Sequence, residues 1–226
     1  MSPRGIVFFD IDGTLVPSRS SSSFLAERLG HLEELNAAEA RYAAGEATNH
    51  EVSVVDAAGW RDVEVRTIAG WLDELPLIAG IDDVVAWCAH HEVEPVLASL
   101  AWEPVGASIA RRHGFTANGG PRVGVDGTVH DGTVAEHLDE YGKRDRALAL
   151  AAQRGVAPDR CCAVGDSRSD LPLFGSVPTS FALNAGPDAR AAASVSIETG
   201  DLRDLIPWLD RWERGLGRRD GARTPG

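Results

Sequence analysis

The chain has 226 residues, 43% of them apolar and 25% charged, so it can bury one ordinary core and a small accessory domain. Its formal net charge of −12 argues against nucleic acid or an anionic membrane surface as a partner. A small anionic ligand remains compatible with this charge, because a bound cation and a lysine can reverse the sign locally.

The start of the chain and its cysteines favour a cytoplasmic protein. The first five residues lead straight into an apolar segment without the features of a signal peptide, and no apolar run is long enough to span a membrane. The cysteines are an odd set, Cys88, Cys161 and Cys162, and the last two adjoin a predicted core strand. We therefore expect buried, reduced thiols in a reducing compartment.

Short apolar segments alternate with helical patterns along the chain. Residues 6–9 form a continuous hydrophobic run of the kind that is buried on both faces of a parallel sheet. Further strands are predicted at residues 93–98, 160–164 and 180–183. This alternation predicts an α/β fold with a doubly wound, Rossmann-like parallel sheet.

The region between residues 17 and 80 contains no strand of this type and predicts a helical insertion instead. Helical patterns occupy residues 24–29, 32–44 and 63–75, and the serines at 20–23 are suited to an N-cap and a hinge. The core would then comprise residues 1–16 and 81–214. Residues 215–226 are rich in arginine and glycine, which predicts a disordered tail.

Two carboxylates, Asp10 and Asp12, follow the first apolar run. They emerge at the carboxyl end of the predicted strand, which is where open α/β sheets bind ligands. The tripeptide Asp-Gly-Thr proves nothing by itself, since it recurs at 126–128 and 131–133 in a pattern typical of a β-hairpin. An EF-hand also fits poorly, because its glycine is sixth and its glutamate twelfth, whereas here Gly13 is fourth and the twelfth residue is Ser21.

The pattern Asp-x-Asp-x-Thr at residues 10–14 resembles the first motif of the haloacid dehalogenase-like hydrolase superfamily. The other motifs of that superfamily follow in order, with Ser99 after a hydrophobic strand, Lys143 opening a helical segment, and Asp166 and Asp170 after another strand. The order of elements looks most like the phosphoserine phosphatase branch. In that branch the insertion after the first motif is a cap over the active site.

The resemblance implies a phosphatase mechanism with a Mg²⁺ cofactor. Asp10 would attack phosphorus to form an aspartyl-phosphate, while Asp12 would protonate the leaving oxygen and later deprotonate the attacking water. The metal would be held by the side chains of Asp10 and Asp166 and by the backbone carbonyl of Asp12.

The same resemblance implies how the phosphoryl group is held. Ser99 and the amide of Leu100 would bind its oxygens, Lys143 would offset the negative charge, and Asp170 would orient Lys143 or the metal shell. The alternative for Lys143 is a solvated surface lysine, the commonest fate of that residue. Its position at the start of a helical segment, in the expected order, favours the functional interpretation.

The substrate-binding positions depart from the phosphoserine phosphatase pattern. No glutamate follows the first motif, and an ungapped alignment puts Asp56 where that branch has an arginine, although Arg61 or Arg66 could replace it. The second motif reads Ser-Leu-Ala, followed by Trp102, in place of Ser-Gly-Gly. We therefore expect a polyol, sugar, nucleotide or specialised-metabolite phosphate in place of phosphoserine, with Asp56 and Trp102 as contacts. For Trp102, packing is the alternative.

Three functions are compatible with these motifs. The first is a Mg²⁺-dependent phosphomonoesterase, and the second a phosphotransferase or phosphomutase that uses the same site with another hydroxyl as acceptor. The third is a non-catalytic phosphate-binding protein, against which the intact pair of Asp10 and Asp12 argues. Product analysis with added acceptor alcohols would separate the first two.

Overall fold

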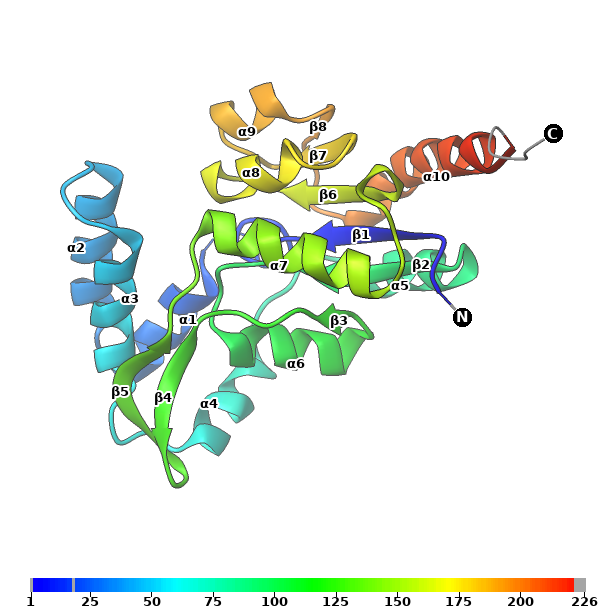
Figure 1. Cartoon of the computed structure of the whole chain (residues 1–226). Helices are drawn as coiled ribbons and strands as arrows, with labels where there is room; N and C mark the ends of the chain where they lie inside the picture. The colour runs from blue at the N-terminus through cyan, green and yellow to red at the C-terminus, as the bar shows by residue number, and fades with distance from the viewer. Residues whose placement is uncertain (1, 18, 222–226) are drawn as a thin grey trace.

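The computed structural model describes residues 2–17 and 19–221 and is built on a six-stranded parallel sheet (Figure 1). The strand order is β3-β2-β1-β6-β7-β8. In chain order the strands are β1 (Gly5–Phe9), β2 (Val93–Leu97), β3 (Thr116–Ala117), β6 (Cys161–Gly165), β7 (Thr179–Leu183) and β8 (Val195–Ile197). The predicted doubly wound, Rossmann-like sheet is therefore confirmed. The edge strands β3 and β8 were not predicted, because segments of two and three residues carry no period.

Both faces of the sheet are covered, and β1 shows how the sequence achieves this. Its side chains alternate, so that Val7 and Phe9 enter one hydrophobic cluster and Ile6 and Phe8 enter another. On the first face pack α5 (Ile81–His90), α6 (Glu103–His113) and α10 (Ile206–Gly221), and on the second α7 (Glu140–Gln153), α8 (Leu171–Phe174) and α9 (Pro187–Ala192). All three cysteines are buried and unpaired, as expected.

Four helices lie between β1 and α5 in the described chain, beyond the carboxyl ends of the strands (Figure 1). They are α1 (Ser21–Leu29), α2 (Leu32–Ala43), α3 (Asn49–Ala58) and α4 (Val65–Leu72). Helix α3 was not predicted, since Val52 and Val54 alternate as in a strand. A capping box marks its start, however: Thr48 Oγ1 accepts the Glu51 N–H at 3.2 Å, and Glu51 accepts the Thr48 N–H at 2.7 Å.

The insertion, the hairpin and the sheet share one apolar interior. Phe24, Trp60 and Leu72 of the insertion belong to the same buried cluster as Phe9 and Val164 of the sheet. The predicted hairpin is present as β4 (Arg122–Asp126) and β5 (Val129–Glu136), and β5 packs against α3. The insertion is therefore packed onto the core over a continuous surface.

The end of the chain differs from the prediction of a disordered tail at 215–226. Helix α10 continues through residue 221, because Leu209, Trp212 and Leu216 form one buried apolar face at helical spacing. Residues 222–226 lie outside the described residues. No helix in the described chain is both long and apolar enough to cross a membrane.

We expect Leu209→Ala to lower the free energy of unfolding by about 2–5 kcal/mol, because it leaves a cavity under α10 at a fully buried position. Arg214→Ala, on the exposed side of the same helix, should stay within about 0.5 kcal/mol of the wild type. Urea unfolding measures both variants. Equal losses would show that the buried face does not anchor α10.

Candidate active site

Three adjacent strands end at the same edge of the sheet, and a predicted site residue follows each one. Phe9 at the end of β1 pairs in parallel with the last residue of β2 and with the penultimate residue of β6. Asp10 and Asp166 directly follow β1 and β6, and Ser99 lies two residues past β2. The backbone N–H of Asp10 also donates to β6 at 2.9 Å. The sheet register thus brings these three residues together.

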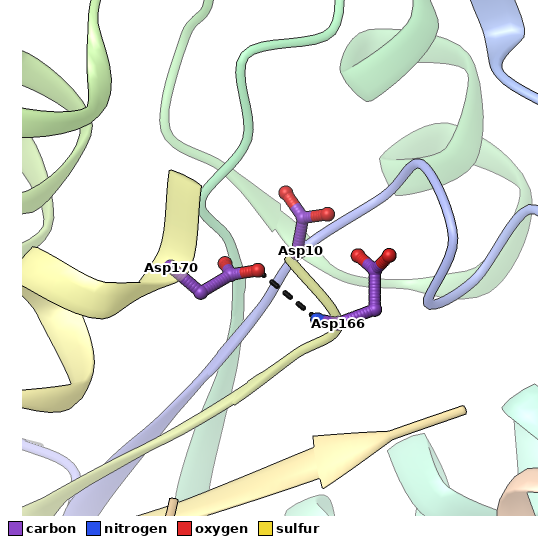
Figure 2. Close-up of side chains that lie close together, drawn as sticks. All are labelled: Asp10, Asp166 and Asp170. Carbon is purple, nitrogen blue, oxygen red and sulfur yellow. Dashed lines mark hydrogen bonds between the residues drawn. The ribbon is translucent and has the colours of Figure 1, made fainter. Parts of the chain in front are cut away.

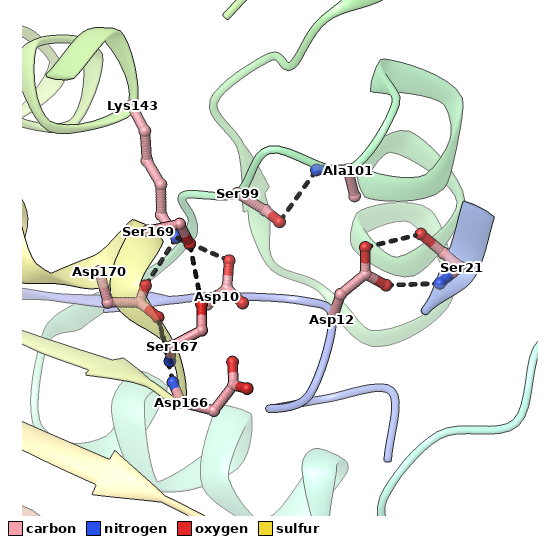
Figure 3. A network of polar contacts seen from close by, with 10 residues as sticks. All are labelled: Asp10, Asp12, Ser21, Ser99, Ala101, Lys143, Asp166, Ser167, Ser169 and Asp170. Carbon is pink, nitrogen blue, oxygen red and sulfur yellow. Dashed lines mark hydrogen bonds and ion pairs between the residues drawn. The ribbon is translucent and has the colours of Figure 1, made fainter. Parts of the chain in front are cut away.

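Lys143 lies in the first turn of α7 and points into this edge (Figure 3). Its Nζ donates to Asp10 Oδ1 at 2.7 Å and to Asp170 Oδ1 at 2.6 Å, and its side chain has no exposed surface. Burial alone would lower the pKa of Lys143, but the two carboxylates outweigh burial and raise it. Lys143 is therefore a charged, buried partner of Asp10, and the surface-lysine interpretation is wrong.

Asp170 holds the lysine and the loop before it at the same time. While Oδ1 accepts from Lys143, Oδ2 accepts the backbone N–H groups of Asp166 at 3.0 Å and Ser167 at 3.1 Å. Both oxygens are therefore committed to the protein. This is the geometry expected of a residue that orients Lys143.

A set of carboxylates suited to a divalent cation lies beside this pair. Asp10, Asp166 and Asp170 each offer an oxygen within 4.8 Å of the others (Figure 2). Since Asp170 is committed, Asp10 and Asp166 are the carboxylates available to a metal. Asp166 Oδ1 is buried and has no hydrogen-bond partner among the described residues, and a Cβ at position 13 would lie 2.2 Å from Asp166 Oδ2, so Gly13 leaves room for that carboxylate. The residues present thus fit a hard cation such as Mg²⁺.

The carboxylates of this site are held in an environment that disfavours their charge. Burial, with Asp10 as the next cause, raises the pKa of Asp166 to about 8. Burial also raises the pKa of Asp10 to about 7, although Lys143 opposes the shift. A bound cation would relieve both groups, because it favours their ionised forms.

Asp12 points away from Asp10, toward the start of α1 (Figure 3). Its oxygens accept the backbone N–H of Ser21 at 2.6 Å and the Ser21 hydroxyl at 3.1 Å. Burial raises the pKa of Asp12, and the bonds from Ser21 oppose that shift. Ser20 is the N-cap of α1, as predicted for the serine run, whereas the contact of Ser21 with Asp12 was missed. No pattern in the sequence signals that contact except the closeness of the serines to the motif.

Ser99 occupies the turn after β2. It is nearly buried, and its hydroxyl accepts the N–H of Ala101 at 3.2 Å (Figure 3). Leu100 between them is half-buried. Figure 3 shows Ser99 on the same side of the sheet edge as Asp10 and Lys143.

Asp56 and Trp102, predicted as substrate contacts, lie in a buried cluster instead. Asp56 is 2% exposed and Trp102 3%, and the Trp102 indole N–H donates to Asp56 at 2.7 Å. In this structure neither side chain is open to a substrate. Of the proposed replacements, Arg66 is exposed and pairs with Glu64, and Arg61 lies against the hairpin at Gly132.

A cavity of about 590 Å³ opens onto the carboxylates. Asp12, Asp166 and Ser167 line it on the side of the chemistry. Arg19, which is paired with Glu27 at 2.8 Å, also lines it, and this residue was not predicted. The cavity gives a small molecule access to Asp12 and Asp166.

Comparison with known proteins agrees with this geometry. A model of the haloacid dehalogenase-like hydrolase family matches residues 7–175. A phosphoserine phosphatase of Albidiferax ferrireducens is 26% identical over 91% of this chain and 90% of its own length, and one of Mycobacterium tuberculosis is 30% identical over 88% and 70%. A solved phosphoserine phosphatase, an analogue of its phospho-aspartyl intermediate, superposes with a TM-score of 0.79 at 20% identity, covering 90% of this chain and 98% of that one, which shows the shared fold. The chain belongs to the haloacid dehalogenase-like hydrolase family, in its phosphoserine phosphatase-like branch.

Proposed function

We propose that the protein is a cytoplasmic, Mg²⁺-dependent phosphatase that hydrolyses a small-metabolite phosphomonoester through an aspartyl-phosphate on Asp10. The observation that carries this proposal is the buried contact of Lys143 with Asp10, 2.7 Å long, beside Asp166, whose Oδ1 has no hydrogen-bond partner in the described part of the chain. It joins a nucleophile, a fixed positive charge and a metal-ligating carboxylate at one sheet edge. Membership of the family and the relatives named as phosphoserine phosphatases support it.

The residues divide the reaction into two displacements at phosphorus. Because Lys143 holds Asp10 Oδ1, the other carboxylate oxygen is free to attack phosphorus. The bond to the leaving oxygen breaks, and Asp12 supplies the proton that this oxygen takes up. A water molecule that gives its proton to Asp12 then attacks the aspartyl-phosphate, which releases phosphate and restores Asp10.

Charge neutralisation is shared among several groups in this proposal. Lys143 and the turn at Ser99 and Leu100 would bind the phosphoryl oxygens, while a Mg²⁺ ion held by Asp10, Asp166 and the Asp12 carbonyl would supply the remaining positive charge. Burial raises the pKa of Asp12, and this direction favours the protonated form that a general acid needs.

The substrate is proposed only as a class, a small phosphomonoester. The relatives' names make phosphoserine the first compound to test. Three sequence departures argued against it. One of them concerns Asp56, which the structure buries away from the cavity. The other two remain: no glutamate follows the first motif, where Arg19 lines the cavity, and the second motif reads Ser-Leu-Ala in place of Ser-Gly-Gly. Polyol, sugar and nucleotide phosphates therefore belong in the same panel.

We expect phosphate release from such a panel to require Mg²⁺, to stop with EDTA and to be lost in Asp10→Asn, which lacks the nucleophile. Asp12→Asn should slow turnover by about 10²–10⁴-fold, since it removes the acid and base. Asp188→Asn, at an exposed position, is the matched control. Turnover that survives Asp10→Asn would contradict the mechanism, and transfer to added alcohols at the expense of free phosphate would assign the protein to the phosphotransferases.

Lys143→Gln should both abolish turnover and destabilise the metal-free protein by about 3–5 kcal/mol, because it leaves buried carboxylates without their partner. Added Mg²⁺ should restore part of that stability, since it also neutralises Asp10. Denaturant unfolding with EDTA and with Mg²⁺ measures both effects. A variant as stable as the wild type in EDTA would show that the lysine does not compensate the cluster.

Stability of the metal-free protein should fall as pH rises from about 4 to about 8. The pKa values of Asp10 and Asp166 are raised to about 7 and about 8 from 3.8, so the folded state binds more protons than the unfolded state across this window. Mg²⁺ needs the ionised carboxylates, so its increase of the melting temperature should be larger at about pH 8.5 than at about pH 5.5. In Asp166→Asn the Mg²⁺ effect should be small at both values. Equal effects of Mg²⁺ on the wild type at the two pH values would contradict these shifts.

A further inference from the structure

A buried carboxylate in the insertion gathers three ring N–H donors. Asp56 of α3 accepts His31 Nε2 at 2.9 Å and Trp60 Nε1 at 3.4 Å on Oδ1, and Trp102 Nε1 at 2.7 Å on Oδ2. Asp56 is 2% exposed, so these hydrogen bonds offset the free-energy cost of removing its carboxylate from water. The mechanism proposed above gives this carboxylate no role.

The third donor comes from a different part of the fold. His31 and Trp60 belong to the insertion, but Trp102 is the N-cap residue of α6 in the core, three residues after Ser99. Between them, the N–H of Ala101 donates to Ser99 Oγ at 3.2 Å. The Asp56 carboxylate of the insertion therefore binds Trp102, which ends the turn that contains Ser99.

Packing fixes the geometry of this contact. The rings of Trp60 and Trp102 meet edge to face with centroids 5.9 Å apart, and Trp60 meets His130 of β5 in the same way at 5.0 Å. The His31 ring lies so close to Gly59 that a Cβ there would be 2.1 Å from it. Asp56 is thus held from several sides, and loss of its bond to Trp102 would leave a buried charge partly uncompensated.

We propose that Asp56 is a positioning residue for phosphate binding: through Trp102 it holds the turn at Ser99 and Leu100 in the conformation that receives phosphoryl oxygens. Asp56 does not touch the substrate. The inference rests on the proposed function, since it takes this turn to be the phosphate-binding one. It assigns to the insertion a part in binding phosphate, at a position where the sequence predicted direct contact with the substrate.

Trp102→Phe tests the proposal, because it keeps an aromatic ring and removes the N–H donor to Asp56 together with part of the indole, a truncation that the control variant shares. The matched control is Trp87→Phe, which removes an indole N–H bond of 2.8 Å to Asp210, in the core and outside this cluster. Asp56→Asn is the second variant, and it retains the shape of the side chain while removing its charge. Calorimetric titration of the 226-residue chain with inorganic phosphate in Mg²⁺, and separately with Mg²⁺ alone, gives the readout.

We expect Trp102→Phe and Asp56→Asn to bind phosphate about tenfold more weakly, which corresponds to ~1.4 kcal/mol. Their Mg²⁺ affinity should match the wild type, since Asp10 and Asp166 are untouched. The double variant should bind phosphate no more weakly than the worse single variant, because both changes act on the same contact. Trp87→Phe should lower the stability of the protein and leave its phosphate affinity unchanged. In turnover assays the two cluster variants should raise KM, with a smaller effect on kcat.

Unchanged phosphate affinity in Trp102→Phe, with a loss of stability like that of Trp87→Phe, would overturn the proposal and make the contact a purely structural one. The wild type could bind phosphate more tightly than the two cluster variants and yet turn over no substrate in the panel. That result would count against the proposed function and still support the positioning role. A wild-type protein that binds no phosphate in Mg²⁺ would overturn both.

Discussion

The structure depends on one concentration of buried charge, in which Lys143 stands between Asp10 and Asp170 at the end of β1. Three carboxylates and one ammonium group leave this region short of positive charge, and burial makes the shortage costly. Part of the negative charge is compensated by hydrogen bonds to Asp170 from the backbone N–H groups of Asp166 and Ser167. What remains is a site whose own electrostatics favour a cation and a proton donor, which is also what hydrolysis of a phosphate dianion demands.

The parts of the fold that were predictable are those with a local signal. The central strands are continuous apolar runs, and Asp10, Ser99 and Asp166 follow three of them, so their meeting at one edge is a consequence of parallel pairing. Lys143 carries no such signal. Only its order among the motifs separated it from a surface lysine, because burial of a lone lysine depends on partners far away in the chain.

The positions that sequence reasoning placed differently are polar residues whose partners are distant. Asp56 and Trp102 are polar or amphipathic and come from segments near the site, which suggested exposure to a substrate. Their contact joins residues separated by 46 positions, and no periodicity reveals it. For α10, the spacing of Leu209 and Leu216 indicates an apolar helical face. The arginines and glycines around these residues nevertheless suggested that the helix ends earlier than it does.

The insertion is less separate from the core than the word cap implies. Its apolar side chains belong to the buried cluster of the sheet, Ser21 holds Asp12, and Asp56 holds Trp102. A swing of the whole insertion on the serines at 20–23 would break all three contacts.

The burial of Lys143 has a practical consequence for chemical labelling. Lys143 is the single lysine of the sequence, and every other permanently cationic side chain is an arginine. An amine-reactive reagent therefore has one side-chain target in the protein, and in this conformation that target has no exposed surface. Mass spectrometry of the tryptic or peptic fragment around Lys143 after brief acylation would report how often the reagent reaches this buried amine, without any introduced label.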